Sequence, residues 1–177
     1  MASTRLLLGA ALLLAGAAAV LAFRPPATDR APALDAPAIE ARLAEVLEAI
    51  YAAHGEEEEA RIYDQLATAA SGELVSALYL QRRRAQVVDH AEAGDTRIQS
   101  VEPFRIEARP LAEAQGYAID AAWRVVGRVE HRTHVHERIN LYAADLVLAP
   151  VEGGWKLTGF TIRDIQRASD LGFEGGE

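Results

Sequence analysis

The chain has 177 residues, of which 50% are hydrophobic and 25% are charged, and its formal net charge is −8. This acidic balance argues against a nucleic-acid partner, because the phosphates would repel the chain. The absence of cysteine excludes disulfide bonds and lipid attachment through a thiol. The length beyond the first segment suffices for one domain with its own hydrophobic core.

An uncharged apolar run, residues 6–22, begins directly after Arg5. Its length is at the short limit for a helix that crosses a hydrocarbon layer of about 30 Å, and it exceeds the apolar part of most cleavable signals. We therefore predict a transmembrane anchor over residues 1–23 that contacts the membrane through residues 6–22. A signal peptide cleaved near Ala22 is the alternative.

The segment after the apolar run predicts a spacer and a location. Residues 24–37 read RPPATDRAPALDAP, and proline-rich chain of this kind forms an extended linker. Long C-terminal domains cross membranes with little regard to flanking charge. We expect a single-pass inner-membrane protein whose C-terminal domain is periplasmic, or a secreted periplasmic domain if the leader is cleaved.

A domain over residues 38–170 follows, with a flexible tail at 171–177, and its first half has helical periodicity. The first helix begins near Pro37 and stops at His54-Gly55, where an imidazole suits the negative helix end. The run Glu56–Glu59 opens a second helix, since acids are favoured near a helix N-terminus. A third helix runs from Gly72 to about His90, and the arginines at 82–84 are interpreted as a solvated face.

From Arg97 onward the pattern predicts strands, at Ile98–Arg109, Tyr117–Val129, Glu137–Pro150 and Trp155–Gln166. Pro103 makes the first of them an edge strand. In the third strand Ile139 and Leu141 have odd numbers, whereas Leu146 and Leu148 have even ones. The apolar positions of the fourth strand also change from odd to even. Such a change along a strand indicates an extra residue, and we therefore predict bulges near Ala143-Ala144 and at Gly159.

Three helices followed by a sharply bent antiparallel sheet predict an α+β fold, a cone of the NTF2-like type. Four large aromatic side chains are expected in its core. They are Trp123, Tyr142, Trp155 and Phe160.

Two stretches of the domain carry a resemblance to a known family. They are Ile62–Asp64 with Ser71–Leu74 and Tyr79–Arg83, and Glu130–Ala144 with Gly154–Leu157. Together they resemble an uncharacterised family of bacterial membrane-anchored proteins with an NTF2-like periplasmic domain. The family's hairpin reads Gly-His-Trp-Gly-His-x-His-x-Arg-x-Asn, followed by Tyr two positions on. The matching residues here are His131, His134, His136, Arg138, Asn140 and Tyr142, whereas Glu130, Arg132 and Thr133 depart from the pattern.

Three histidines of this hairpin, His131, His134 and His136, are the candidate metal ligands. Residues two apart on a strand share a face, so His134 and His136 point the same way, and His131 can approach across the turn. Neutral imidazoles bind zinc, copper or nickel. An exposed polar turn without metal and a pH-sensing cluster are the other interpretations.

Two strand carboxylates, Asp120 and Asp145, are weak candidates for catalysis. A buried aspartate in apolar company has a raised pKa and can transfer protons. No nucleophile–base pair is recognisable, so we predict no catalytic residue with any firm basis. Arg124, Arg128, Arg138 and Asn140 are interpreted as an ion-pair belt on the outer face of the sheet, with an anion site as the alternative.

The sequence therefore favours a non-catalytic, membrane-anchored periplasmic domain for interaction or ligand binding. Its open sheet face would contact a protein partner or a second copy of the chain. A metal-binding module using the three histidines, and a small-molecule lyase or isomerase using a pocket in the cone, are the alternatives.

Overall fold

The computed structural model describes residues 31–56, 58–92, 95–130 and 135–168, with the backbone alone for residues 84–92, 95 and 96. The helices are α1 (Ala36–Gly55), α2 (Glu59–Ala69) and α3 (Glu73–Glu92), and the strands are β1 (Asp95–Pro110), β2 (Tyr117–Glu130), β3 (Val135–Val151) and β4 (Gly154–Arg167). The strands form one antiparallel sheet in the order β1-β2-β3-β4. The predicted α+β class and the order of its elements are confirmed.

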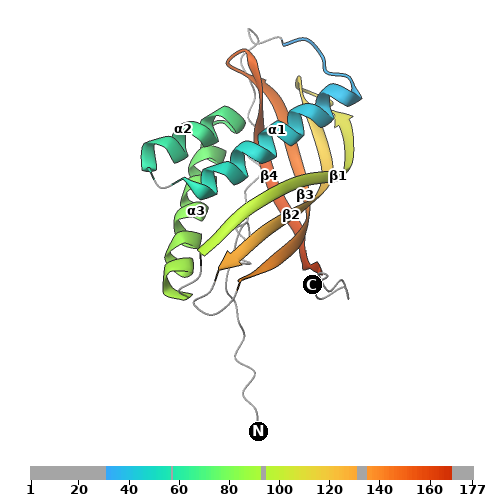
Figure 1. Ribbon diagram of the computed structural model, residues 1–177. Helices are drawn as coiled ribbons and strands as arrows, with labels where there is room; N and C mark the ends of the chain where they lie inside the picture. Colours follow the sequence, from blue (N-terminus) through green and yellow to red (C-terminus); the bar gives the residue numbers. More distant parts are fainter. Residues whose placement is uncertain (1–30, 57, 93–94, 131–134, 169–177) are drawn as a thin grey trace.

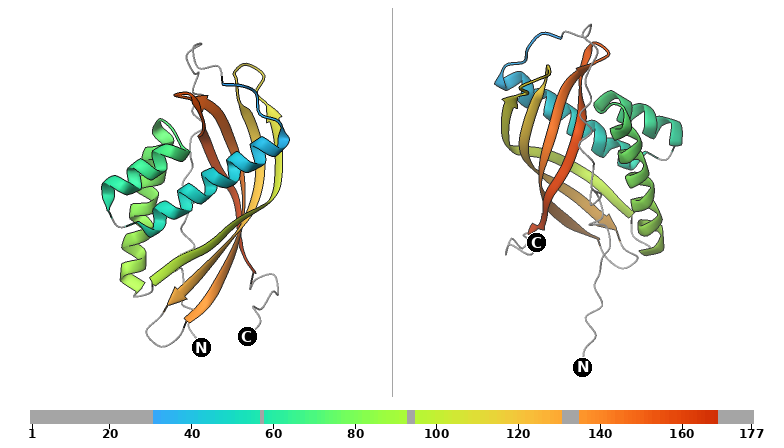
Figure 2. Two further views of the ribbon diagram at one scale, coloured as in Figure 1. Left: turned by 45° about the horizontal axis from the view of Figure 1, so that its top comes forward. Right: turned by 180° about the vertical axis from the view of Figure 1, so that it is seen from behind.

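The helices lie on one face of a strongly bent sheet, which we call the inner face (Figure 1). α1 crosses this face, and α2 and α3 lie beside it, where both contact β4. No described helix covers the opposite, outer face, as the rear view in Figure 2 shows. The core between α1 and the inner face contains large, fully buried side chains, among them Leu43, Leu47, Ile50, Trp123, Tyr142, Leu146, Leu148 and Leu157.

None of the helices within the described residues is long and apolar enough to cross a membrane. Residues 6–22, for which the anchor is predicted, lie outside the described residues.

The last part of the predicted linker is attached to the sheet. The hydroxyl of Tyr117 accepts from the Leu34 N–H at 3.0 Å and donates to the Leu34 carbonyl at 2.9 Å. The side-chain amide of Gln115 donates to the carbonyl of Ala31. Because Ala31 and Leu34 also pack against the core, the folded part of the chain includes residues 31–35.

The two predicted irregularities of the sheet are present. The β3–β4 register shifts between Ala143 and Ala144, and again between Val147 and Leu148, where Gly159 is the partner of Val147. The prediction that Pro103 marks an edge strand is also confirmed, because β1 lies at the end of the sheet. These irregularities allow the sheet to bend.

One consequence drawn from the change of phase is wrong. In both irregularities β4 contributes the extra residue, whereas β3 pairs with β2 in one unbroken register. The even-numbered side chains of β3 therefore face inward along its length, and Ile139 and Leu141 lie half-buried on the outer face. Asn140 and Tyr142 take the inner positions instead.

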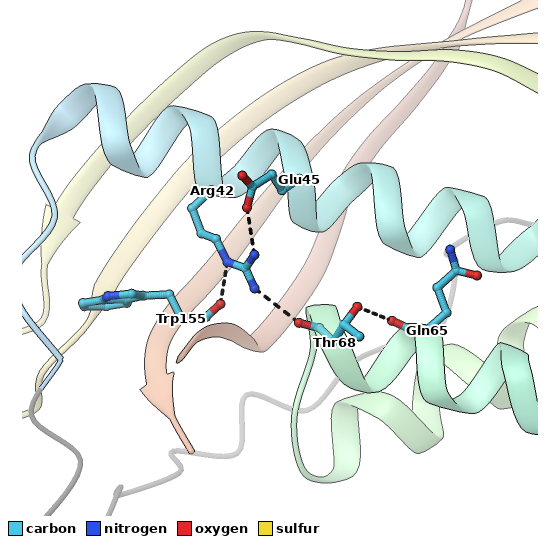
Figure 3. A network of polar contacts seen from close by, with 5 residues as sticks. All are labelled: Arg42, Glu45, Gln65, Thr68 and Trp155. Atoms are coloured by element: carbon cyan, nitrogen blue, oxygen red, sulfur yellow. Dashed lines mark hydrogen bonds and ion pairs between the residues drawn. The ribbon is translucent and has the colours of Figure 1, made fainter. Parts of the chain in front are cut away.

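Arg42 of α1 joins three elements (Figure 3). Its Nε donates to the carbonyl of Trp155 at 2.7 Å, at the start of β4, and its Nη2 donates to the carbonyl of Thr68 in α2 at 3.2 Å. Glu45 completes the set with an ion pair at 2.9 Å. A guanidinium suits this position, because its donors point in several fixed directions at once.

We expect Arg42→Met to lower the free energy of unfolding by about 1–2 kcal/mol, because two backbone carbonyls lose a charged donor. Urea denaturation of the full chain in detergent micelles measures this change. The control is Arg61→Met, since Arg61 is exposed and its ion pairs within the described residues are with Glu56 and Glu58 near α2. It should cost less than about 0.5 kcal/mol. Equal losses in the two variants would show that Arg42 is an ordinary surface arginine.

Candidate functional site on the inner face

A row of polar side chains lies on the inner face of β3. It consists of His136, Arg138, Asn140 and Tyr142, and we call it the polar row. Its members become less exposed along the strand: His136 is exposed, Arg138 is half-buried, and Asn140 and Tyr142 are buried. The face that carries the core thus changes from apolar to polar toward one end of the sheet.

The buried end of the polar row belongs to a chain of hydrogen bonds. The indole Nε1–H of Trp123 donates to the hydroxyl of Tyr51 at 3.0 Å. The hydroxyls of Tyr51 and Tyr142 are hydrogen-bonded to each other, and the amide Nδ2 of Asn140 donates to that of Tyr142 at 3.4 Å. The rings of Trp123 and Tyr142 are stacked with centroids 5.5 Å apart. Burial raises the pKa of Tyr51 and of Tyr142, so both hydroxyls stay protonated at neutral pH.

Asn140 leaves one polar atom without a partner. Its side chain is 6% exposed, and its Oδ1 is buried and accepts no hydrogen bond from a described residue. A buried carbonyl oxygen in this condition costs about 1–3 kcal/mol. Such a group is uncommon in a folded protein and calls for an occupant that donates to it.

Two further polar side chains, His54 of α1 and the buried Arg82 of α3, bind backbone carbonyls at the end of α1. His54 Nδ1 lies 3.0 Å from the Ile50 carbonyl, which fixes the tautomer with the proton on Nδ1, and its Nε2 is buried without a partner among the described residues. Arg82 of α3 donates to the carbonyls of Ala53 at 3.3 Å and Glu56 at 2.7 Å. Burial, with a smaller contribution from the charge of Arg82, lowers the pKa of His54 to about 4.

Both residues differ from their sequence interpretation. His54 was expected to act as an imidazole favoured by the negative helix end, but it is neutral because it is buried. Arg82 was assigned to a solvated face, but it is buried. The spacing of Leu74, Leu78 and Arg82 could have revealed this, because residues four apart lie on one helix face.

The three candidate metal ligands are only partly visible. His131 and His134 lie outside the described residues, and His136 is the exposed end of the polar row. Within the described part of the chain, no group of three or more histidine, aspartate or glutamate side chains could hold a metal ion. The metal site therefore stays a prediction.

Asp120 and Asp145 lie on the outer face, in a network of ion pairs across the sheet. Asp120 Oδ1 accepts from Arg163 at 2.6 Å and from Arg105 at 3.1 Å, and Arg163 also pairs with Asp145 at 3.3 Å. Asp145 is 61% exposed. The hydrogen bond from Arg163 lowers the pKa of Asp120, whereas a buried aspartate in apolar company was expected to have a raised one.

Two of the four residues predicted to form an ion-pair belt on the outer face do so. Arg124 and Arg128 lie on the outer face, and each pairs with a glutamate. Asn140 was assigned to the same face, but it lies on the inner face, and Arg138 follows it there in the polar row. The reason is the unbroken β2–β3 register described above.

The elements define an α+β domain with three helices ahead of a four-stranded antiparallel sheet. No model of a known protein family matches the sequence, and no curated protein matches it. Among solved structures, the chain is similar to the crystal structure of the intermembrane space region of the chloroplast protein ARC6. The identity is 14% and the TM-score is 0.51, and the match covers 74% of this chain and 98% of that chain. At this identity the likeness shows a common fold.

We expect the burial of His54 to make the protein sensitive to acid. The unfolded chain binds the proton near pH 6.5 and the folded chain only near pH 4, so stability falls as the pH drops between these values and is unaffected above them. The total loss is about 3 kcal/mol. Urea denaturation of wild type and His54→Gln between pH 7.5 and pH 4 measures it, since subtracting the two profiles removes the contribution of the carboxylates.

The control for this experiment is His136→Gln, because His136 is exposed and its ring is not desolvated. This variant should keep the acid sensitivity of the wild type. Parallel profiles for wild type and His54→Gln would mean that His54 is solvated in the folded protein.

Proposed function

We propose that this chain is a non-catalytic protein-interaction domain, held outside the cytoplasm by residues 6–22, and that it binds its partner through the outer face of the sheet. The observation that carries the proposal is this face itself, which no described helix covers. A sheet of this kind commonly packs one face on a core and leaves the other free.

The middle of the outer face has an apolar strip, formed by Val126, Ile139 and Leu141. Val126 and Ile139 are cross-strand partners, and Leu141 follows two residues after Ile139. All three are half-buried rather than covered. An apolar strip surrounded by polar residues is the usual composition of a contact surface.

The charges around the strip are compensated within the face. Asp120 lies between Arg163 and Arg105, and Arg124 pairs with Glu102. Although the whole chain carries a net charge of −8, this network leaves no strong single-sign field over the strip. Either a second copy of the chain or another protein can therefore approach it.

The proposal also includes the fold family of the domain and its location in the cell. The bent sheet, with the three described helices on its inner face, supports an NTF2-like cone and the resemblance to the bacterial membrane-anchored family. The similar chloroplast region lies in an intermembrane space. Together with the apolar run, this likeness supports an inner-membrane protein with a periplasmic domain, or a secreted one after cleavage near Ala22.

We expect a photo-crosslinking amino acid at Ile139 or Leu141 to give a protein adduct in intact membranes containing the full chain. The adduct would be a dimer of the chain or a conjugate with another protein, and mass spectrometry distinguishes the two. The control is the same probe at Glu40, which is exposed on α1, the helix that crosses the inner face. No adduct from the outer face, or equal yield from Glu40, would refute the proposal.

A metal-binding module is the second candidate function. Its site would lie at the exposed end of the polar row, where His136 is located. Alternation along β3 places His136 on the face of Arg138 and Asn140. If His131 and His134 close on it, the purified full chain should retain about one zinc, copper or nickel ion, and the triple change of these histidines to alanine should remove it. Elemental analysis after dialysis measures the content, and a metal-free wild type would eliminate this candidate.

The lyase or isomerase alternative has the weakest support. A pocket inside the cone would open on the inner face, whereas Asp120 and Asp145 lie in ion pairs on the outer one.

A further inference from the structure

Two side chains with unmet hydrogen-bonding capacity are neighbours on the inner face. Asn140 of β3 and Arg167 of β4 are paired across the two strands. Cross-strand partners share a face and have Cβ atoms about 5 Å apart, so Arg167 lies on the inner face next to Asn140. Asn140 is buried and Arg167 is half-buried at the end of the sheet.

Both side chains keep hydrogen-bonding capacity that no described residue uses. Asn140 Oδ1 is a buried acceptor without a donor. Arg167 carries a permanent positive charge and five donors, yet it forms no hydrogen bond or ion pair with a described residue. Two neighbours with opposite needs are satisfied together by one molecule that offers both a donor and an anionic acceptor.

Arg138 adds a second positive charge to this place. It precedes Asn140 by two residues and lies on the same face of β3. Its charge acts on the nearby hydroxyl of Tyr142. Although the chain has a net charge of −8, two arginines, Arg138 and Arg167, therefore lie beside the buried amide of Asn140.

We propose that the inner face binds a small organic acid whose carboxylate is adjacent to a hydroxyl or ammonium group, that is, an α-hydroxy acid or an α-amino acid. The carboxylate binds the guanidinium of Arg167, with Arg138 in support, since planar guanidinium groups match carboxylates in two-point hydrogen bonds. The hydroxyl or ammonium group donates to Asn140 Oδ1. This site is separate from the outer face and does not depend on its function.

The experiment is isothermal titration of the full chain in detergent micelles with two matched pairs of acids. L-malate is compared with succinate, which lacks the hydroxyl, and L-glutamate with glutarate, which lacks the ammonium group. In at least one pair the acid with the extra donor should bind saturably and about tenfold or more tightly, because its analogue leaves Asn140 Oδ1 unpaired. Absence of saturable binding below about 10 mM in both pairs, or equal affinity within each pair, would overturn the proposal.

Three variants assign the contacts. Asn140→Leu should reduce the difference within the discriminating pair to less than about threefold, since the acceptor is gone. Arg167→Gln should weaken both acids about tenfold or more, and it stays informative if the change at the buried Asn140 prevents folding. Arg163→Gln is the matched control, because Arg163 lies on the outer face of the same strand, and it should leave both affinities unchanged. If Arg163→Gln weakens binding as much as Arg167→Gln, the acids bind through general charge and the site is wrong.

Discussion

The unbroken pairing of β2 with β3 is the constraint on which both faces of the sheet depend. Because no bulge interrupts it, the face of every side chain in β3 follows from its number alone. Tyr142 meets Trp123 and the core, Asn140 lies beside it, and Ile139 and Leu141 are directed outward. The irregularities that allow the sheet to bend lie in its two outer strand pairs, because every register shift involves β1 or β4. The central pair is regular, and the irregularities lie where it joins the outer strands.

This arrangement places polar groups where most sheets have only apolar ones. Hydrogen bonds from Trp123 to Tyr51 and from Tyr51 to Tyr142 supply a donor to each hydroxyl inside the core, and the stacked rings bury a large apolar area. A network of this kind favours one arrangement of the core, because any slip would leave polar groups unpaired. Three buried polar atoms of the described residues lack a partner, namely Asn140 Oδ1 next to this network, His54 Nε2 and Trp155 Nε1. Unmet polar groups of this kind are expected at sites of binding, where the missing partner comes from another molecule.

Much of the fold follows from local patterns, and the errors have a common physical origin. The order of the elements, the edge position of the strand with Pro103 and the two irregularities of the β3–β4 pair could be predicted, because helix periodicity, proline chemistry and phase act locally. The face of Asn140 could not, since the change from odd to even apolar positions along this strand was interpreted as a bulge in it. The outer face carries an apolar strip of its own, so apolar character does not identify the inner face in this strand. The environment of His54 was misjudged because it depends on the contact between α1 and α3, which no local pattern reveals. The burial of Arg82, by contrast, agrees with the spacing of Leu74, Leu78 and Arg82 on one helix face.

The two faces of β3 differ in how their charges are compensated, and this difference separates their roles. On the outer face Asp120 is bound by arginines from β1 and β4, so the charges form a closed set that joins all four strands. The set is partly exposed, so removing one member would cost the sheet little stability, and an incoming ligand would find little uncompensated charge there. On the inner face Arg167 has no described partner, and the nearest unmet group is an acceptor on a neutral amide. A neutral amide cannot balance a guanidinium, so the charge of Arg167 is uncompensated within the described part of the chain and is open to an anionic ligand. Broad contact therefore suits the outer face, whereas the inner face is suited to recognising a small charged molecule.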